Sequence, residues 1–254
     1  MDWESIEDRS RTPKIPYHFE SIPDFIKRMM YNFKRDRWDG QDYYLELMTE
    51  KDALSSVLSP IVHEKYHMGF NVVHGYSSIT SIYDMSKRFM EALNAGKKGV
   101  LLYVGDHDPS GLDMVRDVRE RLSELLRYAP VDVIPVALTM DQIHEFNPPP
   151  NPAKITDSRA KSYIAQYGAA SWEVDALRPD VLIRFVEEAI LGYLDVGIMN
   201  EVVKREQKQV EELRYIAENF DAIFAALSPE SNSGTDEQYD PKTAKEFSAD
   251  DHGS

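Results

Sequence analysis

The sequence predicts an α/β fold: a parallel four-stranded sheet with flanking helices, preceded by an N-terminal helix and followed by a C-terminal helical extension. Between residues 43 and 138, short apolar, β-branched and aromatic runs alternate with longer segments whose apolar residues recur at helical spacing. Glycine, serine and proline turns separate these segments. Strands that alternate with helices pair in parallel, so their carboxyl ends meet at one edge of the sheet.

Residues 1–41 are predicted to form an arm and a helix. Pro23 begins the helix, whose apolar face ends at Phe33. The helix runs into a basic and aromatic segment that contains Arg35 and Arg37. Two interpretations stay open, because cations favour a helix C-terminus and arginines also contact nucleic-acid phosphates.

The predicted core is residues 42–146. Each of its four strands leads into a helix or a short helical turn. The expected strands are 43–48, 69–74, 99–104 and 131–138, and the helical segments that follow them are 53–62, 79–93, 112–125 and 140–144. The turn between the second strand and its helix contains Ser77, and a Gly-Ser turn there either starts the helix or holds a phosphate through backbone N–H groups.

The third strand ends in two carboxylates one residue apart, Asp106 and Asp108, within the segment Gly-Asp-His-Asp-Pro-Ser-Gly at 105–111. Open α/β sheets bind ligands at this edge. Two clustered carboxylates repel each other, and a hard divalent cation relieves that repulsion. Alternatively, Asp106 only caps the following helix and Asp108 is solvated.

Glu50 stands at the end of the first strand, followed by Lys51. By itself it is a first-turn acid that favours a positive helix N-terminus, with Thr49 as the cap. Because parallel strands end at one edge, however, Glu50, Asp106 and Asp108 are expected to converge there.

Residues 147–227 are predicted to be a proline-rich linker and a helical extension, with short helical stretches near Tyr163, a helix at 180–194 and a last helix at 198–227. The apolar stripe of the last helix suits either a dimer seam or packing within its own domain. Residues 228–254 carry seven acids against two lysines and are expected to be an acidic disordered tail.

Composition excludes several classes of protein. No apolar run approaches the ~20 residues that span a bilayer, and the acidic N-terminus is unlike a secretion signal. The 254 residues contain no cysteine, which favours a cytoplasmic protein without a thiolate metal site. A net charge of −15 means that nucleic acid would have to be bound by a local basic patch or with a partner.

The paired acids resemble a known family. Glu-Lys-Asp-Ala at 50–53 and Asp-His-Asp-Pro-Ser-Gly at 106–111 are similar to the motifs of the Toprim domain, a Rossmann-like catalytic module of primases, topoisomerases and nucleases. The match is best with the topoisomerase VI A subunit and its meiotic double-strand-break relative, including the segment Trp-Glu-Val-Asp-Ala-Leu at 172–177. The resemblance extends over about residues 42–195.

This resemblance implies roles for the matched residues. Asp106 and Asp108 would bind Mg²⁺ or Mn²⁺, and Glu50 would be a metal ligand or a general acid/base in phosphodiester chemistry. Lys51 is either a phosphate contact or a solvated lysine at a helix start. His107, between the two acids, is expected to point away from them if the strand pleat persists.

One departure from the family changes the expected chemistry. Only 49 residues precede Glu50, and Tyr17 and Tyr31 lie in no recognisable version of the topoisomerase tyrosine motif. We therefore expect metal-dependent hydrolysis of nucleic acid, most simply by a DNA nuclease or nickase acting with an ATPase or DNA-translocating partner. The alternative is a non-hydrolytic module that binds nucleic acid or assembles a larger complex. Family habit and the last helix suggest a homodimer.

Overall fold

The computed structural model describes residues 18–73, 79–127, 129–153 and 160–227. The chain forms two compact units, one of residues 34–208 and one that combines the described residues 18–33 and 209–227. The predicted arm at 1–16, the turn with Ser77 and the acidic tail at 228–254 lie outside the described residues. None of the described helices is both long and apolar enough to cross a membrane.

The larger unit contains the predicted parallel sheet. Its strands are β1 (Tyr43–Thr49), β2 (Gly69–Val72), β3 (Lys98–Val104) and β4 (Val131–Ala137). They are arranged in the order β2-β1-β3-β4, and every neighbouring pair is parallel. This confirms an α/β sheet of the Rossmann-like kind. Thr49 at the end of β1 pairs with Val104 at the end of β3, so the residues that follow the two strands start side by side.

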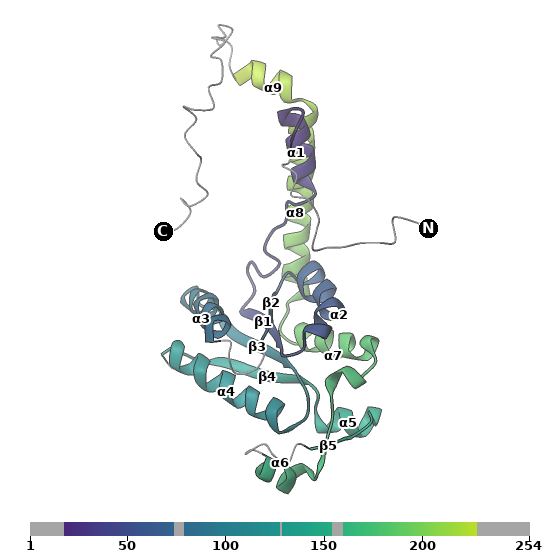
Figure 1. The fold of residues 1–254 in the computed structure, drawn as a ribbon. Helices are drawn as coiled ribbons and strands as arrows, with labels where there is room; N and C mark the ends of the chain where they lie inside the picture. The colour runs from purple at the N-terminus through teal and green to yellow at the C-terminus, as the bar shows by residue number, and fades with distance from the viewer. Residues whose placement is uncertain (1–17, 74–78, 128, 154–159, 228–254) are drawn as a thin grey trace, which may run out of the picture. The chain divides into compact units, whose positions relative to one another are not determined.

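Helices cover both faces of this sheet (Figure 1). On one face lie α3 (Ile79–Asn94) and α4 (Pro109–Leu125). On the other lie α2 (Ser55–Ser59), the π-helical turn η4 (Pro60–Lys65) and α7 (Pro179–Leu191). The segment predicted as one helix at 53–62 is therefore divided, with a 3₁₀ turn η3 (Asp52–Leu54) before α2. Pro60, at the start of η4, has no N–H to continue a regular helical ladder.

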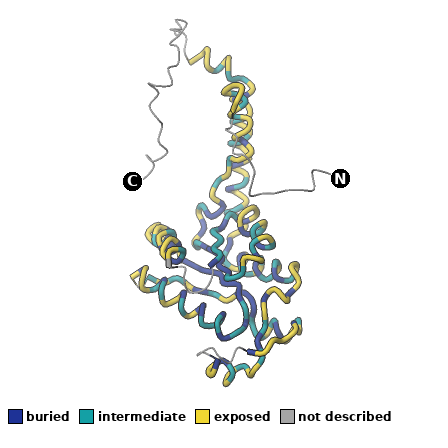
Figure 2. The backbone as a smooth tube through the Cα atoms, in the orientation of Figure 1, coloured by how far each residue is buried: buried dark blue, intermediate teal, exposed yellow. Residues whose placement is uncertain are grey.

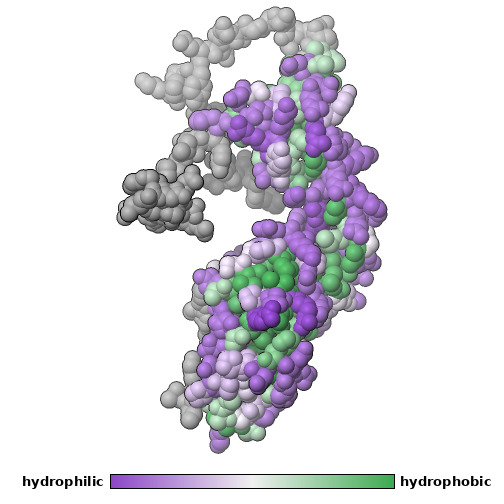
Figure 3. Space-filling model, turned by 90° about the vertical axis from the view of Figure 1, so that its right-hand side faces the viewer, coloured by the Kyte–Doolittle hydropathy of each residue, from purple (hydrophilic) through white to green (hydrophobic). Residues whose placement is uncertain are grey.

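Alternate strand residues supply the two cores, which form the buried centre of the unit in Figure 2. Leu45 and Leu47 of β1 pack with Leu102 of β3 on the α7 face. Met48 and Leu101 point to the opposite face, against α3 and α4. This period-two arrangement explains why the strands read as continuous apolar runs, since both faces are covered. Figure 3 views the side that carries α2 and α7, where apolar surface is visible between hydrophilic side chains.

A buried carboxylate interrupts the apolar run of β1. Glu46 has no solvent exposure, and the guanidinium of Arg88 on α3 donates to both of its oxygens at 2.7 Å. The hydroxyl of Tyr44 and the amide of Asn71 also donate to Glu46, at 2.7 and 2.6 Å. A Cβ on Gly69 would lie within 3 Å of the Glu46 side chain, so a glycine is needed beside it. This network is a fully partnered buried charge and serves to fix α3 on the sheet.

The segment after β4 packs in the same unit as the sheet. It contains α5 (Met140–Phe146), the two-stranded pairing of β5 (Asn151–Pro152) with β6 (Ala170–Ser171), α6 (Ala160–Tyr167) and the 3₁₀ turn η6 (Val174–Ala176). Val174, Leu182 and Val186 are buried in the same cluster as Leu45 and Leu47. Packing therefore groups residues 147–208 with the sheet, across the boundary expected at residue 146.

The basic segment before β1 is tied to α8 (Val196–Glu218). Arg37 and Glu206 form a bidentate pair at 2.6 and 2.9 Å, and both side chains are buried. The backbone N–H of Arg35 donates to the same carboxylate at 2.8 Å, and the Arg35 guanidinium lies 3.6 Å from Asp39. The guanidinium of Arg37 is thus engaged in a structural pair, which accounts for this cation without a phosphate.

The smaller unit contains α1 (Ile22–Met30), the end of α8 and α9 (Phe220–Leu227). Ser21 caps α1 by accepting a hydrogen bond from the N–H of Asp24 at 3.2 Å, so the helix begins at Ile22, one residue before the expected start at Pro23. The single last helix predicted at 198–227 is instead two helices that separate at Asn219. The side-chain amide of Asn219 donates to the carbonyl of Tyr215 at 2.8 Å, which competes with the helical backbone pattern at that point.

Candidate functional site

The junction between β3 and α4 is built around two glycines. A Cβ on Gly105 would overlap the ring of Tyr103, and a Cβ on Gly111 would overlap the backbone carbonyl oxygen of Asp106. Only glycine permits both approaches, so the chain can turn sharply from the strand into the helix. These two contacts explain why the segment 105–111 begins and ends with glycine.

The two aspartates of this turn have different partners. Asp108 is the N-cap of α4, and its Oδ1 accepts from the N–H of Gly111 at 2.7 Å. The alternative that Asp106 caps the helix and Asp108 is solvated is therefore wrong in its assignment, because Asp108 is the residue that caps α4. Asp106 Oδ1 accepts from the N–H of Val174 at 2.8 Å. Burial raises the pKa of Asp106, whereas this N–H and the charge of Lys51 oppose the rise.

Tyr103 interacts with acids that follow β1 and β3. Its hydroxyl donates to Glu50 Oε1 at 2.6 Å, which fixes the glutamate that follows β1 beside the end of β3. Burial raises the pKa of Tyr103 well above its usual range, and the negative charges of Glu50, Asp106 and Asp108 raise it further. Glu50 is therefore held beside the end of the strand that Asp106 and Asp108 follow. Sequence reasoning missed Tyr103 because a tyrosine within an apolar strand resembles an ordinary core residue.

Lys51 lies among acids from two distant segments. Its Nζ is 3.1 Å from Asp106, 3.1 Å from Asp175 and 3.5 Å from Glu173. Burial lowers the pKa of Lys51, but hydrogen bonds and charge from Asp175 and Asp106 outweigh burial, so its pKa is raised. The ammonium therefore stays charged and neutralises part of the cluster. The sequence pointed to residues 172–177 only through a family resemblance, without placing their acids on Lys51.

Residues 163–175 hold the aspartate turn in place. His107 and Trp172 exchange both backbone hydrogen bonds, at 2.9 and 3.0 Å. The hydroxyl of Tyr163 lies 2.9 Å from both Nδ1 and the carbonyl oxygen of His107, and 3.0 Å from the carbonyl of Ala170. The imidazole of His107 is buried against Tyr163, Tyr167 and Trp172, and burial lowers its pKa. These contacts agree with the expectation that His107 is not part of the acid cluster.

The carboxylate oxygens of Glu50, Asp106 and Asp108 are suitable ligands for a hard cation, but the three side chains are not arranged as a set of three ligands. Among the described residues, no group of three or more histidine, aspartate or glutamate side chains is arranged to hold a metal ion. Mg²⁺ commonly uses only one or two carboxylates and completes its shell with water and phosphate oxygens. Asp106 and Asp108 match that smaller requirement, with Glu50 held nearby by Tyr103.

The remaining sequence-predicted contacts do not converge on this edge. Arg35 and Arg37 precede the start of β1, whereas Glu50 follows its end, and both arginines interact with Glu206 or Asp39 as described above. Ser77 lies outside the described residues. Of the predicted phosphate contacts, Lys51 alone is placed beside the acids by the described chain. No protein-family model matches this chain, and no curated protein matches it either.

Proposed function

We propose that this protein is a Toprim-type, metal-dependent phosphodiesterase that hydrolyses nucleic acid, with DNA as its substrate and Mg²⁺ or Mn²⁺ as its cofactor. The observation that carries the proposal is that Glu50, hydrogen-bonded to Tyr103, and the turn with Asp106 and Asp108 follow the carboxyl ends of two adjacent parallel strands. Ligand sites of open α/β sheets lie at this edge. Carboxylates in this arrangement suit a cation that carries phosphate oxygens.

Each residue has a distinct proposed role. Asp106 and Asp108 would hold the divalent cation, which when bound supplies positive charge to a phosphate oxygen and to an attacking water. Glu50 would either share in holding the cation or take the proton of the water as its oxygen bonds to phosphorus and the bond to the leaving oxygen breaks. Tyr103 is a positioning residue, since its hydroxyl holds Glu50 Oε1.

Lys51 supplies positive charge to the acidic side chains of the proposed site. Its ammonium lies between Asp106 and the acids of residues 173–175, where it offsets their repulsion. A phosphate that reaches Asp106 through a cation would also lie close to this ammonium. Lys51 is accordingly proposed to contact the phosphate of the bound strand.

The test is cleavage of supercoiled and linear DNA with Mg²⁺ or Mn²⁺. Asp106→Asn and Glu50→Gln keep the shape of the side chain and remove its charge, and each is expected to lower the cleavage rate at least 100-fold, in the range of lost acid–base or metal function. Asp132→Asn is the matched control, because Asp132 is an exposed acid of β4. Binding of Mn²⁺, measured by calorimetry, should weaken in Asp106→Asn but not in Asp132→Asn.

Wild-type protein that cleaves neither DNA nor RNA with any divalent cation would overturn hydrolysis. The second candidate function, a non-hydrolytic module that binds nucleic acid, is favoured by one observation: the ammonium of Lys51 pairs with Asp106 at 3.1 Å. DNA binding without cleavage, unaffected by Mn²⁺, would establish that second function.

We further propose that an ATPase or DNA-translocating protein, or a second copy of this chain, joins the active assembly. Sedimentation of the purified protein tests self-association.

A further inference from the structure

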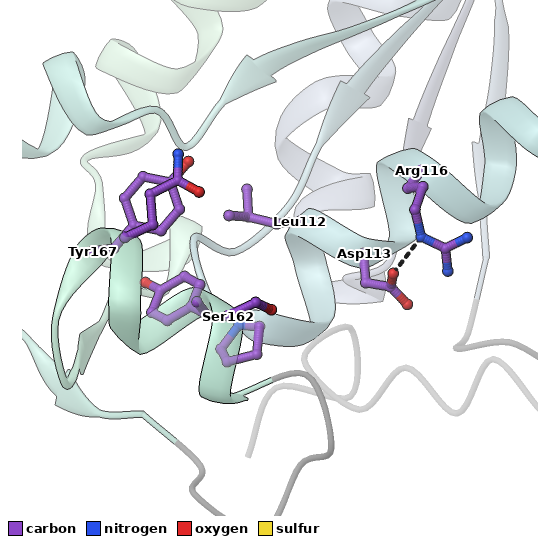
Figure 4. Close-up of a pocket in the computed structure, with 8 residues that line it drawn as sticks. Leu112, Asp113, Arg116, Ser162 and Tyr167 are labelled. Atoms are coloured by element: carbon purple, nitrogen blue, oxygen red, sulfur yellow. Dashed lines mark hydrogen bonds and ion pairs between the residues drawn. The ribbon is translucent and has the colours of Figure 1, made fainter.

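A groove separates the first turns of α4 from α6, immediately beyond the aspartate turn (Figure 4). It has a cavity volume of about 220 Å³. Eight residues line it: Pro109, Leu112, Asp113, Arg116, Ser162, Tyr163, Gln166 and Tyr167. In Figure 4, Leu112 extends from α4 toward Tyr167, and the Asp113–Arg116 pair lies on the α4 side, away from Tyr167.

The groove combines aromatic and apolar walls with polar groups. The rings of Tyr163 and Tyr167 are 5.1 Å apart and tilted by 46°, and Pro109 and Leu112 form the apolar wall on α4. Ser162 and Gln166 contribute a hydroxyl and an amide, the donors and acceptors that read the edges of a planar ring. Drug-sized ligands occupy pockets of roughly 300–1,000 Å³, so this smaller groove suits one flat ring system.

The groove is rigidly connected to the proposed catalytic edge. Pro109, in its wall, directly follows Asp108 in the chain. Tyr163 contacts His107, the residue between the two aspartates, through both the imidazole and the backbone. Burial raises the pKa of Tyr163, and the charge of Asp108 raises it further, so the carboxylate of Asp108 and the Tyr163 hydroxyl interact electrostatically.

The guanidinium of Arg116 is oriented by two acids. It lies 2.7 Å from Asp113 and 2.5 Å from Glu120, and about half of its side chain is exposed. The groove therefore carries no unbalanced positive charge of its own. Its recognition chemistry is stacking and edge hydrogen bonding, which suits a neutral base better than a phosphate.

We propose that this groove binds a nucleobase of a single strand, next to the phosphate held at Asp106 and Asp108. This inference rests on the proposed function, because the strand has to reach the aspartate turn. Tyr167 supplies the stacking surface, while Ser162 and Gln166 contact the edge of the base. Stacking tolerates every base, so the groove selects an unpaired nucleotide more than a sequence.

The test uses a single-stranded oligodeoxynucleotide with one 2-aminopurine, titrated with protein in Ca²⁺ and in EDTA. The probe's fluorescence is expected to fall on binding, and Tyr167→Ala should weaken binding about 10-fold, as expected for the loss of one stacked base. Tyr167→Phe retains the ring and should bind like the wild type. Ser162→Phe fills the groove from an exposed helix position and should weaken binding without removing a packed ring.

Controls separate the possible outcomes. Tyr83→Ala, at a half-exposed tyrosine of α3, should leave binding unchanged. An oligonucleotide that is abasic at the probed position should lose its sensitivity to Tyr167→Ala, and free 2-aminopurine deoxyriboside should bind far more weakly than the strand. Equal affinity of Tyr167→Ala, Ser162→Phe and wild type would overturn the groove assignment. Cleavage is scored separately: normal cleavage with unchanged binding rejects only the groove, and quenching without cleavage rejects only hydrolysis.

Discussion

Glu206 and Arg37 form an ion pair in which both side chains are buried. Burial alone would raise the pKa of Glu206, but hydrogen bonds from Arg37 and from the backbone N–H of Arg35 outweigh burial and lower it to about 2. A carboxyl whose folded pKa is below its unfolded value contributes stability above the unfolded pKa. That stability is lost as the pH falls toward the folded value.

At the residue scale we therefore predict a pH-dependent loss of stability that Glu206→Gln removes. As the pH falls from 4.5, the usual pKa of a glutamate, to about 2, the wild type should lose roughly 3 kcal/mol of unfolding free energy through this group. Urea unfolding at pH values from 2 to 7 measures the loss. The control is Glu201→Gln, on the exposed surface of the same helix, which should keep the wild-type pH profile. A Glu206→Gln profile parallel to that of the wild type would contradict the assignment.

At the scale of elements, the two strand–helix junctions determine the site. β1 and β3 end in register, and Gly105 and Gly111 let the β3–α4 turn fold closely around Tyr103 and the carbonyl of Asp106. The Asp108 cap closes the first turn of α4. The site thus depends on backbone geometry that only residues without a side chain permit at two positions.

Gly111→Ala is predicted to destabilise the protein by about 3 kcal/mol, in the range of backbone clashes at special positions, because its Cβ would overlap the carbonyl oxygen of Asp106. Thermal unfolding followed by circular dichroism measures the change. Gly197→Ala provides the comparison, since Gly197 lies near the start of α8 and its added Cβ would meet only the Asp195 carboxylate, at 3.1 Å, without the backbone overlap found at Gly111. That substitution should be neutral or slightly stabilising, as alanine favours helix over glycine. Equal effects at the two positions would refute the proposed close approach.

At the scale of the whole molecule, the two compact units differ greatly in their buried content. Both apolar clusters and the Arg37–Glu206 pair belong to residues 34–208. In the smaller unit, the described residues that are buried are Met30 and Ala217. Because burial of apolar surface is the main stabilising contribution, the larger unit should contain the structural stability of the described chain.

A chain of residues 34–208 is accordingly predicted to unfold cooperatively in urea. Its midpoint should lie close to that of the main transition of the full chain, because the described residues among those deleted, 18–33 and 209–227, contribute little burial. Far-ultraviolet circular dichroism and tryptophan fluorescence should report coincident transitions. The matched comparison ends at residue 190 and lacks Leu194 of the core and Glu206, so it should be less stable. A broad, non-cooperative transition of 34–208 would show that the other residues are required for folding.

Local sequence signals predict the order of the main helices and strands, the parallel sheet and the edge of the sheet at which Glu50, Asp106 and Asp108 follow strands. These properties follow from local signals, because apolar periodicity, capping residues and strand–helix alternation are encoded within short windows. Even so, Asn219 divides the last helix, which the apolar stripe alone did not reveal. The functional roles proposed for the three acids remain predictions for the cleavage and metal-binding experiments.

Which distant groups meet depends on tertiary packing, and the structure shows it. The Tyr103 hydroxyl donates to Glu50, the Lys51 ammonium lies between Asp106 and Asp175, and Arg37 forms a buried pair with Glu206. Helix α6 lies beside the turn at residues 105–111, and this packing creates the groove with Tyr167. The physical reason is that such contacts depend on how separate elements pack, and no periodic pattern within one element specifies the partner that another element supplies.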